Sequence, residues 1–537
     1  MDFQAFPLFI LTSCFKLVGA ILLVSLLTAI YRLTLHPLSA IPGPKWAAVS
    51  NIWLARHVRD GRMLALGKRL HDDFGPVVRV GPNEVWFNSR DAFRLIYNAG
   101  SGFGKSDFYV ATKLNRPISD WKCWQGLNWP DTLDLLSEFD TRRYRLQRRL
   151  IGPVYQTSNV RRFERAVDEV IGRVVAKLRA LDGVEVDLKE WMHIVAVECL
   201  GAVVLSWSPG YIRDGSDGGT STQSYLGWKR KSVFGLFPLV TKLSFFSKSL
   251  GRWFSNAWGV TFATPRNFKP FFTPVYQKSS KRIAAALRQA STAKAASKDE
   301  RKDLLADLVQ LHRDRPEFTE TYLRRLAVTN FGAGHETMCS ALTSIMTMIG
   351  SHDRVRQRVN DEVRSCVPAP SPISCEDAAQ LRYTQASMKE AQRLYPVIGM
   401  SLSRKVPAEG FSCHGYYIPP GYTVGCNPIS LHRNRDIYGP DADEYRPERW
   451  LLELQQRDCT AAAAAAQARD MDRYHLIWGG GARTCPGRHL AEMVLCKVVP
   501  ALCREFDIEV VARPGDDETK FYFMAMLTGV RARFVPV

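Results

Sequence analysis

The segment Trp478-Gly-Gly-Gly-Ala-Arg-Thr-Cys-Pro-Gly487 decides how this chain is interpreted. It places Cys485 between a glycine-rich turn and a helical pattern that begins near His489. Glycine adopts positive φ readily, so backbone N–H groups of the turn can point at the sulfur. The N-terminus of the following helix adds positive potential, and both effects favour the thiolate form of Cys485.

Haem iron suits such a thiolate. A thiolate ligand pushes electron density onto the iron and assists cleavage of the O–O bond, whereas globins use an imidazole. Arg483 lies close enough in sequence to pair with a haem propionate through its planar guanidinium group. Chance would give the pattern G-x-R-x-C-x-G roughly 0.01 times in a chain of this composition. A zinc site would need more ligands than His489 supplies, and no cysteine-protease partner set is recognisable.

The composition is that of a folded, strongly basic protein. Of its 537 residues 46% are hydrophobic and 23% are charged, so the chain can bury a large core. No zinc-finger spacing, basic helical arm or RNA-binding signature accompanies the net charge of +19, which argues against nucleic acid as a partner. An anionic membrane surface or an acidic redox partner explains the charge. The 12 cysteines form no C-x-x-C pair and indicate reduced thiols in a cytosol-facing body.

The N-terminus predicts a membrane anchor. Residues 6–31 carry a single charge, at Lys16, and their uninterrupted part from Leu17 to Tyr31 suits the hydrocarbon core of a bilayer. A cleaved signal peptide is the alternative, but no small-x-small cleavage site follows the apolar run. Basic residues after the span place the rest of the chain in the cytosol. We expect an anchor over residues 1–36, a proline-rich linker over 37–44 and a haem-thiolate monooxygenase domain over 45–537.

The cysteine segment resembles the signature F-x-x-G-x-R-x-C-x-G of the cytochrome P-450 family, with Trp478 in place of phenylalanine. The resemblance extends over residues 37–537 and is strongest to fungal pisatin demethylase-like members. It implies a mainly α fold with a small β portion, preceded here by a single N-terminal transmembrane helix. It also implies haem b as the cofactor, with Cys485 as the iron ligand in a binding loop that includes Trp478, Gly481, Arg483 and Gly487.

A second motif of the family lies at Lys389-Glu-Ala-Gln-Arg-Leu-Tyr-Pro396. Its E-x-x-R spacing puts Glu390 and Arg393 on one face of a helix, where they can pair. Taken alone, the motif would be a surface ion pair, which contributes only tenths of a kcal/mol. Arg449, in the sequence Pro-Glu-Arg-Trp, resembles the third member of the family's buried charge network. We therefore expect the three residues to be buried together behind the haem loop.

The sequence Phe331-Gly-Ala-Gly-His-Glu-Thr-Met338 lies inside a helical pattern that runs from about residue 319 to residue 350. Each interior glycine costs ~1 kcal/mol relative to alanine, which suggests close approach of a ligand or a kink. The segment resembles the family's oxygen-binding groove A-G-x-D/E-T, which implies that Glu336 and Thr337 deliver protons during oxygen activation. Met338 departs from the usual second Thr or Ser, and His335 is expected to pack or contact water rather than bind metal.

Further residues match the positions that hold the haem propionates in the family. Tyr144 and Arg148 lie on one predicted helix, with Tyr144 where Trp or His is commoner. Arg404 matches another such position, after the turn that follows the E-x-x-R helix. Four nearby arginines are expected at the surface, where they could contribute to a reductase-docking patch: Arg145, Arg149, Arg161 and Arg162.

Several segments suggest a lipophilic substrate and a second membrane contact. On the family's layout, substrate contacts come from four mostly apolar or small segments, residues 106–129, 327–333, 397–403 and 524–528. Residues 225–272 are rich in aromatic and basic residues and contain no Asp or Glu, which suits contact with lipid headgroups or, equally, a packed core. Residues 209–223 are predicted to be a flexible loop, and residues 461–466 a low-complexity insertion.

The sequence thus predicts a monooxygenase that inserts one oxygen atom from dioxygen into a lipophilic small molecule of fungal secondary metabolism, a terpenoid, polyketide or alkaloid. No Rossmann fingerprint is present, so NADPH is expected to supply electrons through a separate cytochrome reductase, with cytochrome b5 as a further candidate donor. The expected location is the endoplasmic reticulum membrane, crossed once, with a cytosolic catalytic domain. Two alternatives stay open, a haem-thiolate isomerase or dehydratase that needs no dioxygen, and a non-catalytic membrane haem sensor.

Overall fold

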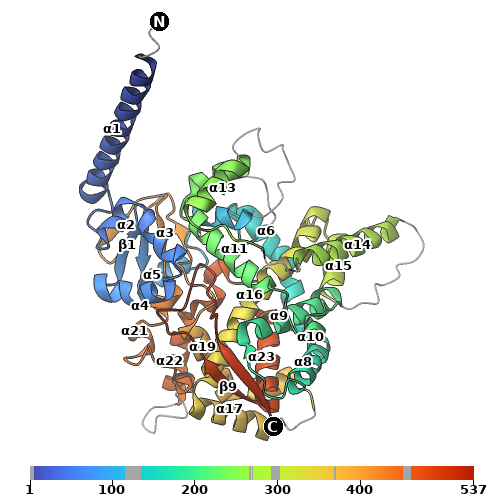
Figure 1. The fold of residues 1–537 in the computed structure, drawn as a ribbon. Coiled ribbons are helices and arrows are strands. Elements are labelled where there is room, and N and C mark those ends of the chain that lie inside the picture. The colour runs from blue at the N-terminus through green and yellow to red at the C-terminus, as the bar shows by residue number, and fades with distance from the viewer. Residues whose placement is uncertain are drawn as a thin grey trace.

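The computed structural model describes residues 5–114, 135–264, 268, 270–291, 303–367, 371–451 and 461–537. Helices make up most of this part and strands form three small sheets (Figure 1), which confirms the predicted mainly α fold with a small β portion. The longer helices are α1 (Ala5–Thr34), α3 (Ile52–Arg59), α4 (Met63–Phe74), α5 (Arg90–Tyr97), α6 (Thr141–Ile151), α8 (Glu164–Arg179), α9 (Leu188–Leu205), α11 (Thr220–Gly235), α12 (Pro238–Phe246), α13 (Lys248–Ala257), α14 (Phe272–Ser291), α15 (Leu304–Asp314), α16 (Glu320–Gly350), α17 (Asp353–Cys366), α19 (Arg382–Leu394), α22 (Ala461–Arg473) and α23 (Arg488–Glu505). The shorter ones are α2 (Lys45–Val49), α7 (Thr157–Arg161), α10 (Tyr211–Asp214), α18 (Cys375–Gln380), α20 (Pro428–Leu431) and α21 (Arg435–Tyr438).

The largest sheet has five strands in the order β1-β2-β8-β5-β3. Only the β2–β8 pair in it is parallel. Its strands are β1 (Val77–Gly81), β2 (Glu84–Phe87), β3 (Gly104–Lys105), β5 (Arg404–Lys405) and β8 (Thr423–Gly425). The other two sheets are antiparallel and consist of β4 (Val186–Asp187), β10 (Arg531–Pro536) and β9 (Phe506–Ala512), and of β6 (Phe411–Cys413) and β7 (Tyr416–Ile418).

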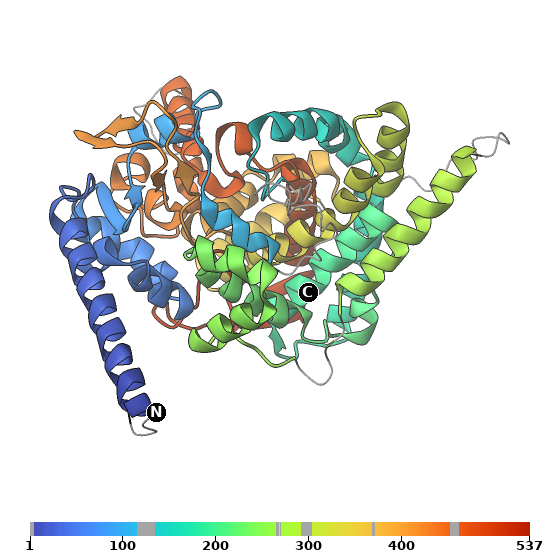
Figure 2. The same ribbon diagram turned by 90° about the horizontal axis from the view of Figure 1, so that it is seen from above.

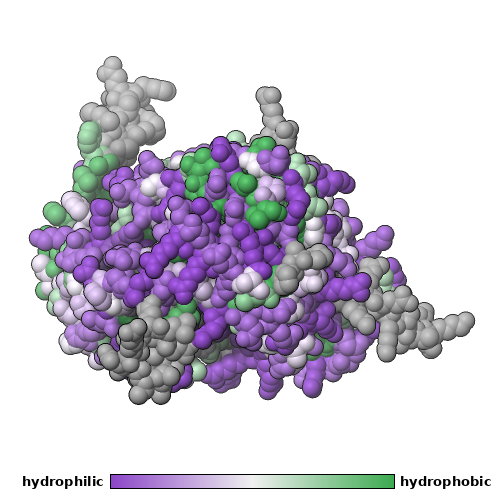
Figure 3. Space-filling view, turned by 90° about the horizontal axis from the view of Figure 1, so that it is seen from below, coloured by the Kyte–Doolittle hydropathy of each residue, from purple (hydrophilic) through white to green (hydrophobic). Residues whose placement is uncertain are grey.

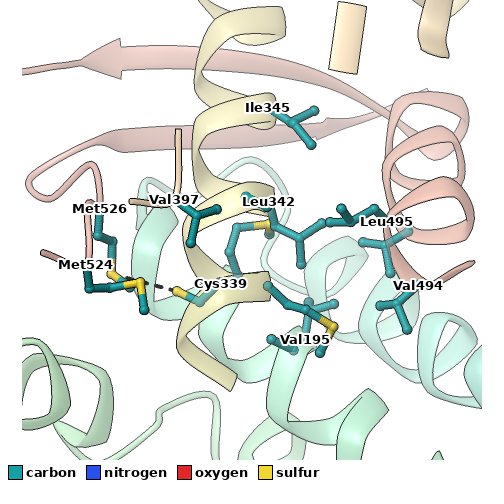
Figure 4. Close-up of a cluster of buried hydrophobic side chains, with 14 of the residues drawn as sticks. Val195, Cys339, Leu342, Ile345, Val397, Val494, Leu495, Met524 and Met526 are labelled. Atoms are coloured by element: carbon teal, nitrogen blue, oxygen red, sulfur yellow. Dashed lines mark hydrogen bonds between the residues drawn. The ribbon is translucent and has the colours of Figure 1, made fainter. Parts of the chain in front are cut away.

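Helix α16 is the axis of the core. It begins where the pattern predicts, because Thr319 caps it by accepting a hydrogen bond from the backbone N–H of Tyr322 (3.4 Å). Every residue in its C-terminal half, from residue 338 to residue 350, is buried. Figure 4 shows Leu342 pointing toward Leu495 of α23, while the Cys339 sulfur contacts Met526 of the C-terminal segment (4.0 Å). Burying a leucine at such a site contributes roughly 1.5–3 kcal/mol, so this packing fixes α16 against its neighbours.

One segment differs from the prediction. Residues 209–223 are not a flexible loop, since they contain α10 and the start of α11, and Asp217 between them is buried. Its carboxylate accepts hydrogen bonds from the backbone N–H groups of Gly219 (2.8 Å) and Ser221 (2.9 Å), which orders the turn. Residues 461–466, the predicted low-complexity insertion, form the start of helix α22, because a run of alanines has a high helix propensity.

Helix α1 projects from the body (Figures 1 and 2), and a buried arginine holds its base. Its stretch Phe15–Thr34 has a mean hydropathy of 2.0, is not buried, and is long and apolar enough to cross a membrane. Arg79 in β1 donates to the carbonyls of Arg32 (2.8 Å) and Leu38 (3.3 Å) and to Nδ1 of His36 (3.1 Å). The Arg79 side chain is only 2% exposed, so the chain leaving α1 is folded onto the sheet.

Candidate active site

Cys485 follows two short 3₁₀ helices, η6 (Leu476–Trp478) and η7 (Gly481–Arg483), and precedes the start of α23. The backbone N–H of Cys485 donates to the carbonyl of Trp478 (2.8 Å) and closes the turn. Gly481 has a φ of +58°, and a Cβ there would lie 1.9 Å from the carbonyl oxygen of Tyr97 in α5. Glycine is therefore required for the turn to lie on Tyr97.

Cys485 is surrounded by protein, yet its side chain is exposed rather than packed against other side chains. Burial raises the pKa of its thiol, while the backbone N–H of Gly487 and the charge of Arg148 act in the opposite direction. The amide effect expected from the sequence is present and acts against the effect of burial. A metal ion bound at the sulfur would hold it deprotonated outright.

Three arginines converge on Tyr144 near this cysteine. Burial raises the pKa of the Tyr144 phenol, and the charges of Arg148, Arg483 and Arg404 oppose that shift. The guanidinium carbon of Arg483 lies 3.7 Å from the centre of the Tyr144 ring, whose hydroxyl donates to the carbonyl of Ala482 (2.9 Å). Within the described part of the chain, none of the three arginines forms an ion pair with a carboxylate.

These residues fit a haem. Buried cations require compensating charge, and the two propionates of a haem supply it. The guanidinium fork matches a carboxylate in two parallel hydrogen bonds. Cys485 would hold the iron, and the propionates would lie among Arg148, Arg404, Arg483 and the Tyr144 hydroxyl. The remaining loop residue, Trp478, is partly exposed and closes the turn through its carbonyl.

Glu336, the predicted acid of the oxygen groove, faces helix α11. It is 4% exposed and accepts hydrogen bonds from the Ser224 hydroxyl and from the indole N–H of Trp228. Burial raises the pKa of Glu336, although Lys231 and the two hydrogen bonds oppose the shift. The acid is therefore held by the protein and favours its protonated form more than a surface glutamate does.

Thr337 lies on a side of α16 that does not face α11 and that is partly exposed. Its side chain is partly exposed and its hydroxyl donates to the carbonyl of Ala333 (2.7 Å), a residue that is itself exposed. The interior glycines do not interrupt the helix. A Cβ on Gly334 would meet two methyl groups of Leu200 in α9 at 3.0 Å, whereas one on Gly332 would make only ordinary contact. The close approach inferred from these glycines is thus to a neighbouring helix.

His335 is buried inside the protein, as expected. Its ring packs against those of Phe271 and Phe272, with centroids 5.2 and 5.6 Å away, and the two phenylalanine rings also contact each other. Its Nδ1 lies 3.1 Å from Nε2 of His193 in α9. The residue therefore joins α16 to its neighbours by packing and by a hydrogen bond.

Glu390, Arg393 and Arg449 form the expected buried network. Glu390 accepts hydrogen bonds from Arg393 (2.7 and 2.8 Å), from Arg449 (3.1 Å) and from the indole N–H of Trp450 (2.9 Å). Arg393 also donates to the carbonyl of His432 (2.5 Å), whose ring accepts from the backbone N–H of Leu476 at the start of the cysteine turn (2.8 Å). The network therefore supports the loop from behind.

The structure adds residues that sequence reasoning missed. The Tyr97 hydroxyl, beneath the cysteine turn, donates to the carbonyl of Leu402 (3.0 Å) and accepts from the N–H of Cys426 (2.9 Å). Nothing in the local sequence marks Tyr97 for this position. Ser224 and Trp228 were likewise unassigned, and Trp228 belongs to the aromatic stretch 225–272, for which lipid contact and a packed core are equal expectations.

Two of the predicted substrate segments lie side by side. The backbone N–H of Gly399 donates to the carbonyl of Phe523 (2.9 Å), and that of Ala525 donates to the carbonyl of Val397 (2.8 Å). Figure 4 shows Val397 beside Met524 and Met526. Of the predicted segment 106–129, residues 115–129 lie outside the described residues, and the preceding part forms a 3₁₀ helix.

Comparison with known proteins agrees with this geometry. The model of the family described as Cytochrome P450 matches residues 134–530. The chain is 64% identical to cytochrome P450 monooxygenase sdnT of Sordaria araneosa, over 98% of this chain and 96% of that protein. It is 29% identical to cytochrome P450 monooxygenase gsfF of Penicillium aethiopicum, over 94% of each chain. Pisatin demethylase of Fusarium vanettenii is 26% identical over 90% of this chain and 88% of that protein. The chain therefore belongs to the cytochrome P450 family and is a monooxygenase.

Proposed function

We propose that this enzyme inserts one oxygen atom from dioxygen into a lipophilic small molecule of fungal secondary metabolism. The observation that carries the proposal is a deep but open cysteine sulfur beside three arginines that have no carboxylate partner within the described residues. Haem b would supply the oxidising chemistry, because a thiolate ligand assists O–O cleavage. Cys485 is the proposed iron ligand, and Trp478, Gly481 and Gly487 shape the turn around it.

Glu336 and Thr337 are the proposed proton donors. Reduction of dioxygen in a dry site requires protons that solvent cannot supply directly. The raised pKa of Glu336 favours a protonated acid on the α11 side of α16, and the Thr337 hydroxyl lies on the open side. The pair would carry protons across the helix, with Ser224 and Trp228 holding the acid in place.

Electrons are proposed to come from NADPH through a cytochrome reductase, with cytochrome b5 as a second candidate donor. Redox partners with acidic surfaces are attracted by exposed basic side chains. Four such arginines lie on or after α6, and all are exposed: Arg145, Arg149, Arg161 and Arg162. This surface is the proposed docking patch.

The proposed location is the endoplasmic reticulum membrane, with residues 1–36 as a single-pass anchor, 37–44 as a linker and 45–537 as a cytosolic domain. Figure 1 places α13 at the same upper edge of the body from which α1 extends. Leu239, Phe246 and Trp253 of α12 and α13 are 61–70% exposed, which suits contact with lipid. The opposite face, seen in Figure 3, is mostly hydrophilic. This asymmetry supports a second membrane contact.

The substrate is proposed to be a terpenoid, polyketide or alkaloid. The segments expected to contact it contribute apolar side chains such as Met400 and Met524, both buried. Few polar groups are available there to orient a ligand, so lipophilicity would dominate recognition.

A reduced carbon monoxide difference spectrum tests the proposal. Wild type should show the strongly red-shifted Soret band of haem-thiolate proteins, and Cys485→Ser should lose it. A band of the imidazole type, or a folded protein without haem, would overturn the assignment. Incubation of reductase-reconstituted enzyme with isotopically labelled dioxygen and a lipophilic panel then separates a monooxygenase, which incorporates the label, from an isomerase or a haem sensor.

A further inference from the structure

Asp217, His193 and His335 form a buried chain that the proposed function does not use. Oδ2 of Asp217 lies 2.9 Å from Nδ1 of His193, and Nε2 of His193 lies 3.1 Å from Nδ1 of His335. The three residues are at most 1% exposed. They connect the turn before α11, helix α9 and helix α16, so the chain crosses from one helix layer to the next.

The carboxylate sets the direction of the chain. Burial alone would raise the pKa of Asp217, but His193 and the hydrogen bonds from Ser221 hold it below its usual range. An ionised Asp217 at 2.9 Å favours a proton on Nδ1 of His193 through its charge, although the N–H is not aligned as a hydrogen bond. One further proton lies between the two rings. Burial, His193 and Lys231 lower the pKa of His335 well below its ordinary value, so this ring is neutral and its tautomer is defined by its neighbour.

The chain ends where α16 needs external support. His335 lies between Gly334 and the acid Glu336, and each interior glycine lowers the intrinsic stability of the helix by about 1 kcal/mol. Gly334 brings α9 close to α16 at this level, as its near contact with Leu200 shows. Glu336 is bound to α11 at the next position, so hydrogen bonds hold both sides of this turn.

We propose that Asp217 and His193 are positioning residues that fix the tautomer of His335 and, through it, the turn of α16 that carries Glu336 and Thr337. The inference rests on the proposed role of that pair in proton delivery. Lys231 of α11 is a further charged group whose field reaches both His335 and Glu336. The predicted consequence is that proton delivery, rather than haem binding, depends on Asp217.

The test uses Asp217→Asn in the full-length holoenzyme. Asparagine keeps the shape of the side chain but can donate to Nδ1 of His193, which would reverse the proton positions along the chain. Nitrogen-15 spectra of histidine-labelled protein report this reversal, with His193→Gln used to assign the signals. The matched control is Glu198→Gln. Glu198 is a buried carboxylate in α9, the helix of His193, but it accepts hydrogen bonds from Ser208 and Gly210.

The functional readout requires no known substrate. With reductase and NADPH, reduction of dioxygen to hydrogen peroxide consumes two electrons and two protons, and reduction to water consumes four of each. Disturbed proton delivery should raise the fraction of electrons that appear as peroxide by about threefold, because catalysis depends steeply on the placement of reacting groups. The solvent deuterium isotope effect on NADPH oxidation should change as well.

The expected result is a reversed tautomer, more peroxide and unchanged haem content in Asp217→Asn, with a wild-type peroxide fraction in Glu198→Gln. Wild-type tautomers and peroxide fraction in Asp217→Asn, or an equal peroxide rise in the control, would overturn the inference. If wild type itself consumes no NADPH with reductase, the proposed function fails, and the nitrogen-15 spectra still decide whether Asp217 fixes the tautomer.

Discussion

Two groups of buried or partly buried arginines lie near the cysteine turn, and their partners differ. Arg393 and Arg449 share the carboxylate of Glu390, and Arg449 also binds Asp441 (2.8 Å). The arginines around Tyr144 face one another, and the charge of Arg404 lowers the pKa of Arg483 further after burial has lowered it. One group is neutralised by the protein, and the other is left with excess positive charge.

The comparison separates structural from binding charge. A buried ion pair that is complete stabilises little by itself, but removing one member leaves an uncompensated charge. A cluster of like charges without a counter-charge destabilises the folded protein, and binding of an anion relieves that penalty. Mutations in the two groups should therefore act on different quantities, folding in the first and retention of the haem in the second.

The largest effect is expected for Arg393→Ala. The change leaves Glu390 buried without its two strongest hydrogen bonds, at a cost of ~3–5 kcal/mol, and it removes the support of the loop through His432. The protein should lose haem rather than change its turnover, as measured by haem content and thermal unfolding. Arg382→Ala, at the exposed start of the same helix, is the control. A folded and fully haem-loaded Arg393→Ala variant would contradict the structural role of the network.

A smaller effect is expected for Arg148→Ala. The variant should fold and bind haem, but lose it about tenfold faster, since a charge-assisted hydrogen bond contributes ~1.5–3 kcal/mol and Arg148 is only partly buried. Transfer of haem to excess apomyoglobin measures the rate. Arg145→Ala, one turn away and exposed, should leave the rate unchanged. Equal rates in the two variants would show that Arg148 does not bind a propionate.

The smallest effect is expected in acid. Burial opposes ionisation of Glu390 and Asp441, but hydrogen bonds and charge from the arginines outweigh it and hold the pKa of each below its usual value. Such groups stabilise the fold above the pKa of the unfolded chain, about 4, and this contribution is lost as the pH falls through the folded pKa. Asp441→Asn should therefore reduce the loss of thermal stability between about pH 6 and pH 3.

Melting curves at the two pH values measure this difference. Asp353→Asn, which changes an exposed carboxylate, is the control and should melt with the pH dependence of wild type. An unaltered pH dependence in Asp441→Asn would mean that the network does not contribute to acid sensitivity.

The sequence predicted contacts that depend on local spacing. Glu390 and Arg393 are one helical turn apart, so their pairing follows from the helix itself, and the start of α16 follows from its cap at Thr319. The family resemblance supplied Arg449, which is distant in sequence. The glycine-rich turn likewise predicted a backbone N–H that lowers the pKa of Cys485, but local pattern could not predict the burial that opposes it.

Contacts between helices that are far apart in the chain could not be predicted from the sequence. Ser224 and Trp228 reach Glu336 only because α11 crosses α16, and His193 meets His335 only because Gly334 lets α9 approach. The local sequence predicts a flexible loop around Asp217 because glycine, serine and aspartate favour turns. The same residues order the turn once the carboxylate accepts two backbone N–H groups and faces a histidine.

The contacts of Arg79 would give the proposed membrane anchor a mechanical role. A helix of the length of Phe15–Thr34 spans about 30 Å, so in a thinner bilayer it must tilt to keep its apolar surface covered. A flexible tether would absorb that tilt. Here the base of α1 is bound to β1 by a buried guanidinium, so in the proposed anchored state the catalytic body would turn with the helix, and its height above the lipid would depend on bilayer thickness.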